Sequence, residues 1–160
     1  MTDASRTEAP ADASGCIFCA ALAAGGAEPL LVHVGRQAFV ILNKFPYNNG
    51  HLMVVPRRHA ARLVDLEGDE LAEMMTLAQA SERALGDVYG PHGFNLGINL
   101  GRSAGAGIAD HLHMHIVPRW DGDTSFMTVF GETRVLPEDL PVTAARVREA
   151  LRRVLGGQHA

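Results

Sequence analysis

Short apolar runs separated by turn residues dominate the first third of the chain. The runs read "EPLLVHV" (28–34), "QAFVILN" (37–43) and "GHLMVVP" (50–56). Each has the length of a strand, and the turn-rich segments 35–37 and 45–50 lie between them. Because these connections are short, the pattern predicts three strands that pair as an antiparallel meander.

The next part of the chain combines one long helical period with two further strand-like runs. Apolar residues recur at helical intervals from about residue 69 to 88. The runs "FNLGINL" (94–100) and "HLHMHIVP" (111–118) are joined by the glycine-rich segment 101–107, and an amphipathic helix is expected from about 143 to 155. Together these elements predict an α+β fold, with an antiparallel five-stranded sheet, one long central helix and a C-terminal helix.

Length and composition indicate a single domain. With 160 residues, 20% of them charged, the chain can bury a sizeable core. We expect a disordered polar leader over residues 1–14 and one domain over 15–160, with a C-terminal extension from about 119. No apolar run suits a membrane span or a secretory signal, which predicts a cytoplasmic protein without a membrane partner. The net charge of −4 argues against a nucleic-acid surface, so a small partner is expected and any phosphate must be held locally.

The two cysteines form one Cys16-Ile-Phe-Cys19 motif directly after the leader. In a reducing compartment this spacing indicates metal or redox chemistry rather than a structural disulfide. A thioredoxin-like motif would follow a strand, and here a polar leader precedes it, so we discount redox chemistry. The motif supplies half of a zinc site, and the chain offers histidines, but no further thiol, as the remaining ligands.

Three of the eight histidines stand at strict two-residue spacing in "HLHMHIVPRW". On a strand, side chains two residues apart share a face, so that His111, His113 and His115 point one way while the apolar residues between them enter the core. The outer two imidazoles are then roughly 13 Å apart along the strand, too far for both to ligate one ion at about 2 Å. Adjacent members can still share a metal. The row is therefore either one metal-bound histidine beside a free pair or a metal-free group that handles phosphate.

The row resembles the signature of the histidine triad (HIT) nucleotide hydrolases and transferases, His-φ-His-φ-His-φ-φ with φ apolar, which residues 111–117 match at every position. A second family feature, a Gly-His strand ending in Val-x-Pro, is present as Gly50-His51-Leu-Met-Val-Val-Pro56, and Asn43 stands eight residues before His51. The resemblance covers residues 16–118, and the following segment resembles the tail of a bacterial branch that includes diadenosine tetraphosphate phosphorylases. It implies the HIT fold and a purine nucleotide or a dinucleoside polyphosphate, such as diadenosine tetraphosphate, as the bound partner.

The resemblance also implies roles for three histidines. In the family the middle histidine attacks the α-phosphate and forms a covalent nucleotidyl-histidine that water or another acceptor resolves, which makes His113 the expected nucleophile. An imidazole with a pKa near 6.5 is mostly neutral at pH 7 and has a lone pair for this attack. His115 and His51 match the family's contacts to the phosphate and the leaving group, where N–H donors stabilise growing charge.

Further positions match the family's substrate contacts. Asn43 corresponds to the ribose-hydroxyl ligand. Asn99 and the glycine-rich segment after it, including Gly105, correspond to the phosphate-binding segment, where backbone N–H groups approach an anion. Many members carry Gln or Ser four residues before the first triad histidine, whereas this chain has Gly107 and so lacks a side-chain donor there. Ser103 is a candidate to replace that donor.

The resemblance implies a metal site as well. In metal-containing branches two cysteines pair with a histidine after the Val-x-Pro-x-x sequence and with the first triad histidine; the corresponding residues are Cys16, Cys19, His59 and His111. Four N/S ligands leave no open position, which predicts a structural zinc that pins the N-terminal segment to the sheet. Family members usually form homodimers that extend the sheet, and we expect a homodimer without an organic cofactor here.

Three function classes remain open at this point. An intact His113 and His115 favour an enzyme that cleaves the α-phosphate linkage of a dinucleoside polyphosphate or a nucleoside phosphoramidate, with water or inorganic phosphate as acceptor. Gly107 favours a nucleotide-binding sensor or interaction module with little turnover. A cupin-like HxH metalloenzyme would need a further carboxylate and histidine, for which Glu132 and His159 are poor candidates.

Overall fold

The computed structural model of the protein describes residues 13–123 and 138–157. Most of the predicted leader and part of the predicted C-terminal extension lie outside the described residues. Glu132 and His159, the poor candidate pair for a cupin-like metalloenzyme, also lie outside them.

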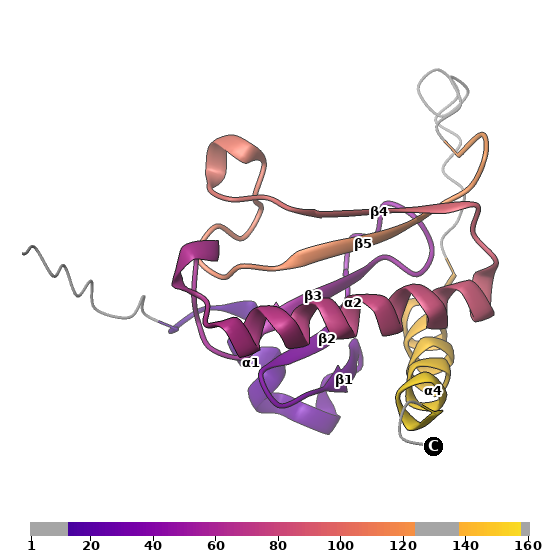
Figure 1. The fold of residues 1–160 in the computed structure, drawn as a ribbon, viewed down its shortest axis with the longest axis horizontal. Coiled ribbons are helices and arrows are strands. Elements are labelled where there is room, and N and C mark those ends of the chain that lie inside the picture. The colour runs from indigo at the N-terminus through magenta and orange to yellow at the C-terminus, as the bar shows by residue number, and fades with distance from the viewer. Residues whose placement is uncertain (1–12, 124–137, 158–160) are drawn as a thin grey trace, which may run out of the picture.

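Five strands form one antiparallel sheet in the order β1-β2-β3-β5-β4, which confirms the predicted fold (Figure 1). The strand limits differ from the predicted ones by up to three residues, since hydrogen bonding rather than hydrophobicity ends a strand. The bounds are β1 (Leu31–Val34), β2 (Ala38–Leu42), β3 (Leu52–Pro56), β4 (Gly93–Ile98) and β5 (Met114–Arg119).

Two of the helices were predicted and one was not. The long helix α2 (Gly68–Tyr89) begins with a capping box between Glu67 and Glu70 and ends at Gly90 in the left-handed conformation. The C-terminal helix α4 (Leu140–Gly157) also matches the prediction. The additional helix α1 (Ile17–Ala24) carries the second cysteine of the Cys-x-x-Cys motif. Short 3-10 turns, η1 (Gly25–Ala27), η2 (Leu63–Asp65) and η3 (Arg102–Ala104), lie in the connections.

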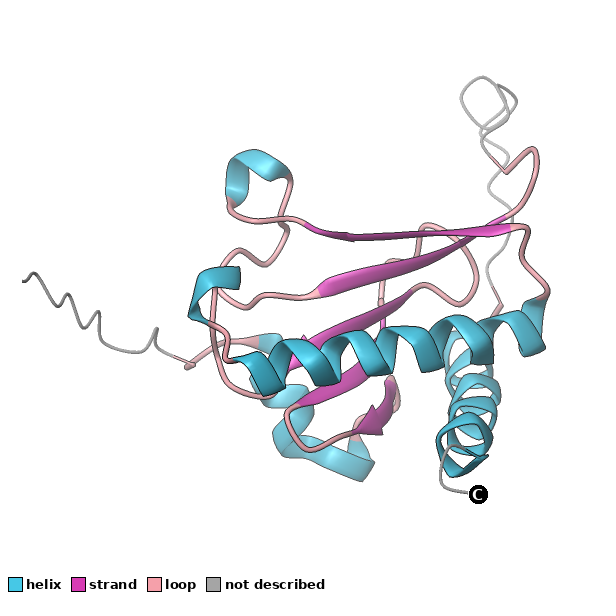
Figure 2. Cartoon of the chain, viewed as in Figure 1, coloured by secondary structure: helices cyan, strands magenta, loops and turns pink. Residues whose placement is uncertain are grey.

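Helices lie on both sides of the sheet (Figure 2). The two faces of the sheet bury different side chains because strand residues alternate. Residues such as Val40, Val54 and Ile116 face α2 and α4 and form the larger core. Their neighbours Phe39 and Val55 face α1 and form a smaller core on the opposite side. No helix among the described residues is long and apolar enough to cross a membrane.

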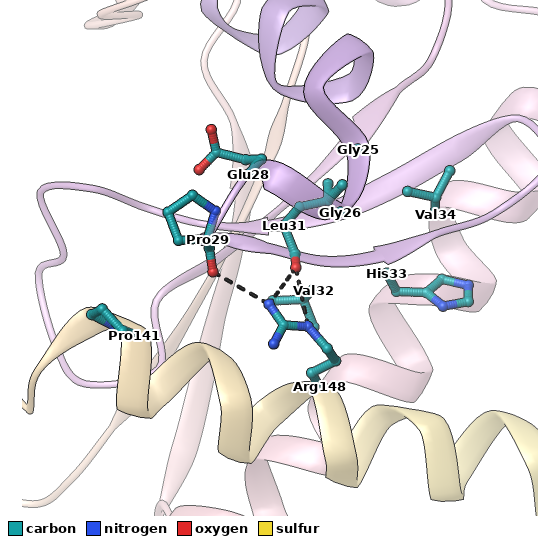
Figure 3. A pocket seen from close by; sticks show the side chains of 10 residues that line it. All are labelled: Gly25, Gly26, Glu28, Pro29, Leu31, Val32, His33, Val34, Pro141 and Arg148. Atoms are coloured by element: carbon teal, nitrogen blue, oxygen red, sulfur yellow. Dashed lines mark hydrogen bonds between the residues drawn. The ribbon is translucent and has the colours of Figure 1, made fainter.

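A cavity of about 610 Å³ lies where β1 meets α4 (Figure 3). Arg148 reaches across it from α4 and donates hydrogen bonds to the carbonyls of Leu31 and Pro29. The guanidinium group thereby satisfies carbonyls at an edge of the sheet. None of the predicted site residues lines this cavity.

Candidate functional site

The three histidines of the row lie at the start of β5, and two of them precede the strand. The backbone N–H of Leu112 donates to the carbonyl of Ala60 at 2.7 Å, so the chain joins the β3–β5 ladder only at Met114. The prediction of a strand over 111–118 was therefore wrong at its first three residues. The predicted alternation nevertheless holds, because Leu112 and Met114 are buried under α2 while His111 and His113 contact α1 on the opposite face.

Backbone carbonyls assign the tautomers of the first two histidines. Nδ1 of His113 lies 2.9 Å from the carbonyl oxygen of His111, and therefore must carry the proton that it donates. Nε2 of His111 donates in the same way to the carbonyl of Pro56 at 2.9 Å. In the neutral rings, Nε2 of His113 and Nδ1 of His111 consequently keep their lone pairs.

A backbone N–H assigns the next pair. The N–H of Tyr47 points to Nδ1 of His51 at 3.2 Å, so this nitrogen is an acceptor and Nε2 of His51 carries the proton. The Nε2–H group of His51 lies 2.9 Å from Nδ1 of His115 and donates a hydrogen bond to it. Nε2 of His115 is then left with an N–H group. The site thus presents a lone pair on His113 next to an N–H donor on His115, whose rings lie 4.9 Å apart between centroids.

Burial keeps these imidazoles neutral. It lowers the pKa of His51 to about 4, and the neighbouring His115 and His113 add to the shift. Burial also lowers the pKa values of His113 and His115 from their ordinary value of 6.5. Neutral rings at pH 7 are the form in which one nitrogen can attack and another can donate a hydrogen bond.

The four predicted metal ligands, Cys16, Cys19, His59 and His111, lie together in one cluster. Their ligand atoms are all within 4.8 Å of one another, although the residues come from the start of α1 and the position before it, the segment after β3 and the segment before β5. The thiol of Cys16 lies 3.3 Å from Nδ1 of His111, and the thiol of Cys19 lies 3.4 Å from Nδ1 of His59 and 3.6 Å from that of His111. This cluster could hold a metal ion.

The geometry and the donors of the cluster fit a tetrahedral zinc. Bonds of about 2.3 Å to sulfur and about 2.0 Å to nitrogen place tetrahedral S and N ligands about 3.5 Å apart, which agrees with the three distances. The hydrogen bond from His111 to Pro56 orients the ring and leaves Nδ1 for the metal. Burial, with a contribution from Cys16, raises the pKa of Cys19 to about 11, so the thiolate form needs a cation beside it.

Phe18 connects the cluster with the histidine row. It lies between the two cysteines on α1, is 1% exposed, and its ring centroid is 5.5 Å from that of His111 and 5.0 Å from that of His113. His111 makes a second connection, because its ring faces the thiols while its carbonyl accepts the hydrogen bond of His113. The metal-ligand cluster and the histidine row are therefore one packed unit.

Not all predicted substrate residues are brought to the histidines. The Asn43 side-chain nitrogen lies 3.4 Å from Nε2 of His51, and its oxygen accepts the N–H of Phe45 at 2.9 Å. Within the described residues, no hydrogen bond joins the histidines to the other four predicted positions, which are Asn99, Ser103, Gly105 and Gly107. Gly107 instead lines a polar cavity of about 550 Å³ that also borders Cys16 and His59.

The family model of the HIT domain matches residues 30–122 of this chain. This region contains β1 to β5 and all three histidines of the row. The chain belongs to the HIT family.

Relatives agree with this assignment. A protein named AP-4-A phosphorylase from Mycobacterium tuberculosis is 50% identical over 111 residues, which are 69% of this chain and 57% of that protein. The chain thus spans little more than half the length of this HIT relative. A second HIT-like protein of M. tuberculosis is 32% identical over 136 residues, covering 85% of this chain and 92% of the relative. The crystal structure of a zinc-bound histidine triad family protein from Mycobacterium smegmatis matches with a TM-score of 0.72 and 26% identity, over 91% of this chain and 99% of that one.

Two residues of this HIT site were not predicted from the sequence. Tyr47 covers His51 and His115 from the solvent side, with ring centroids 4.8 and 6.4 Å away, and is 73% exposed. Phe18 was seen only as a spacer between cysteines. The sequence offered two signals: Phe18 stands inside the Cys-x-x-Cys motif, and Tyr47 stands shortly before the Gly-His pair. Neither signal indicates which residues the aromatic ring contacts.

Proposed function

We propose that this HIT chain cleaves the α-phosphate linkage of a dinucleoside polyphosphate, such as diadenosine tetraphosphate, through His113. The observation that carries this proposal is the hydrogen bond from Nδ1 of His113 to the carbonyl of His111, which leaves the Nε2 lone pair for attack. The 50% identity to a protein named AP-4-A phosphorylase supports the substrate class.

In the first step, Nε2 of His113 attacks the α-phosphorus and forms a P–N bond. The P–O bond to the rest of the polyphosphate breaks, and the leaving oxygen takes the electron pair. The N–H of His115 donates a hydrogen bond to the charge that develops there, and His51 fixes that ring through the 2.9 Å hydrogen bond to its Nδ1. The nucleotidyl-imidazole is cationic, and the His111 carbonyl stabilises it by accepting a hydrogen bond from its Nδ1–H group.

In the second step, an oxygen of water or inorganic phosphate attacks the phosphorus. The P–N bond breaks, its electron pair returns to Nε2 of His113, and the acceptor releases its proton to solvent. Asn43 beside His51 is proposed to hold a ribose hydroxyl, because its amide both donates and accepts. We assign Asn99 and the Gly105 segment to the phosphates, with Ser103 as a donor.

The experiment is incubation with a panel of dinucleoside polyphosphates and adenosine phosphoramidate, with and without inorganic phosphate. We expect His113→Ala to abolish turnover and His92→Ala, an exposed histidine paired with Asp121, to retain it. Release of ADP only with phosphate identifies a phosphorylase, and release of AMP in water identifies a hydrolase. Undiminished turnover by His113→Ala would contradict the proposal.

We also propose that Cys16, Cys19, His59 and His111 hold a structural zinc. The donor set and the distances among the ligand atoms support this, as does the zinc-bound M. smegmatis relative. Such an ion would fix α1 against the sheet and keep both thiols ionised. Metal analysis of protein purified without chelator is expected to give about one zinc per chain, and a ratio near zero would contradict the assignment.

A nucleotide-binding function with little turnover is the second candidate, and Gly107 favours it. This residue provides no side-chain donor, and a Cβ built on it meets no atom within 4 Å. Gly107→Ser therefore adds a hydroxyl without a steric cost. Tight nucleotide binding by the wild type, with turnover appearing only in Gly107→Ser, would identify the binding function.

A further inference from the structure

Two described residues beyond the matched HIT region, Asp123 and Glu138, contact the loop between β2 and β3. This loop, residues 43–50, carries Asn43 and Tyr47 and leads directly into His51. The HIT match ends at residue 122. Asp123, the next residue, accepts a hydrogen bond from the side chain of Asn48 at 3.0 Å, and Glu138 donates its backbone N–H to the side chain of Asn49 at 3.0 Å.

The Asn48 contact is part of a rigid polar network. The same side-chain nitrogen also donates to the carbonyl of Pro118 at the end of β5, at 2.9 Å. Arg119 holds Asp123 with two hydrogen bonds of 2.6 and 2.7 Å, and this guanidinium, with a smaller contribution from Asn48, holds the pKa of Asp123 well below its usual range. The carboxylate is therefore a fixed acceptor.

Asn48 stands between the two hydrogen bonds that orient His51. The backbone carbonyl of Asn48 accepts the N–H of His51 at 3.2 Å, and the N–H of the preceding Tyr47 donates to Nδ1 of His51 at 3.2 Å. A shift of the loop at Asn48 moves both. Without the Tyr47 donor, Nδ1 of His51 can take the proton, and Nε2 can no longer donate to His115.

We propose that Asn48 is a positioning residue: clamped by Pro118 and by Asp123 of the C-terminal extension, it holds the loop so that His51 keeps its Nε2 proton for His115. This inference rests on the proposed function for its kinetic part only. Asp123 would thus contribute to the reaction through the position of His51.

The chain offers a matched control. Asn95 on β4 binds the same arginine, because its side-chain oxygen accepts a hydrogen bond from Arg119 at 2.7 Å. Among the described residues, no side-chain hydrogen bond joins Asn95 to the loop. Asn48→Ala and Asn95→Ala therefore remove the same chemical group from opposite sides of one ion pair. For Asn48→Ala we expect kcat to fall about tenfold with KM changed by less than about twofold, and for Asn95→Ala we expect both to stay within about twofold.

A double-mutant cycle tests whether the contact itself is responsible. Asp123→Ala should lower kcat. In this variant, Asn48→Ala should lower kcat by a clearly smaller factor than it does in the wild type. Independent effects that multiply in the double variant would overturn the proposal, as would equal losses in Asn48→Ala and Asn95→Ala.

The tautomer of His51 gives a readout that needs no turnover. In NMR spectra of protein labelled with ¹⁵N-histidine, two-bond correlations between ring hydrogens and ring nitrogens show which nitrogen carries the proton. We expect the Nε2–H form in the wild type and in Asn95→Ala, and a mixture of forms in Asn48→Ala. An unchanged His51 spectrum in Asn48→Ala would overturn the proposed role of Asn48 even if the wild type is active. If the spectrum changes in Asn48→Ala but the wild type shows no turnover, only the proposed function is overturned.

Discussion

Gly50, the last residue of the loop before His51, is a position where an added side chain would lower stability. Its φ of +78° lies in the region that side chains rarely adopt, and a Cβ would lie 2.8 Å from Leu85 and 3.0 Å from Tyr89, both on α2. We expect Gly50→Ala to lower the free energy of unfolding by about 2–4 kcal/mol. Gly86 on α2 has open space, so Gly86→Ala should stabilise by about 0.5–1 kcal/mol. Urea unfolding measures both, and equal effects would refute this reading of Gly50.

His51 also makes stability depend on pH. Its folded-state pKa is lowered to about 4, so below pH 6.5 the unfolded chain binds a proton that the folded chain does not. The stabilising contribution is therefore fully present above pH 6.5 and is lost as the pH falls toward 4. Between pH 7 and pH 5 we expect His51→Gln to lose about 1–2 kcal/mol less stability than the wild type. Parallel pH curves for His51→Gln and the wild type would contradict the assignment.

At the level of elements, the sequence predicted the larger core better than the site. Helical periodicity located α2 and α4, because each of them buries a regular stripe, and short apolar runs located the strands. It missed α1, although the alanine-rich run before Gly25 was a helix signal, because the cysteines suggested a metal site without suggesting its scaffold. The metal ligands are up to 95 residues apart, so only the family resemblance, and no local spacing, could join them. The Asn48 clamp, which spans 75 residues, was not predicted for the same reason.

Helix α1 is the element that metal removal should affect first. It has eight residues and only two buried side chains, Phe18 and Ala21, and isolated helices of fewer than about 12 residues are marginal in water. We expect a chelator to lower the thermal unfolding midpoint and kcat together, because Phe18 packs on His113. Cys16→Ser should start lower and respond less to the chelator. A chelator that removes zinc without changing either quantity would argue against a structural role.

At the scale of the whole molecule, β1 and β4 are the edge strands of the sheet that the described residues form. On β4 and just beyond it, Leu96 and Leu100 are 44% and 47% exposed, whereas Arg148 covers part of the β1 edge. We therefore expect the homodimer implied by the family to pair β4 with its copy. Sedimentation should show a dimer that Leu96→Lys dissociates and that Val34→Lys, equally exposed on β1, leaves intact. A monomeric wild type, or dissociation by Val34→Lys alone, would contradict this.

The unequal cores on the two faces of the sheet imply that the molecule opens unevenly. Backbone amides of β2 and β3 are buried between both faces and should exchange with deuterium only through global unfolding. Amides of α1 should exchange through a local opening of much lower free energy, which would lift Phe18 from His113 while α2 and α4 stay closed. The proposed nucleophile, His113, would then lose its alignment in molecules that are otherwise fully folded, so activity would report a sub-population that a melting curve does not detect.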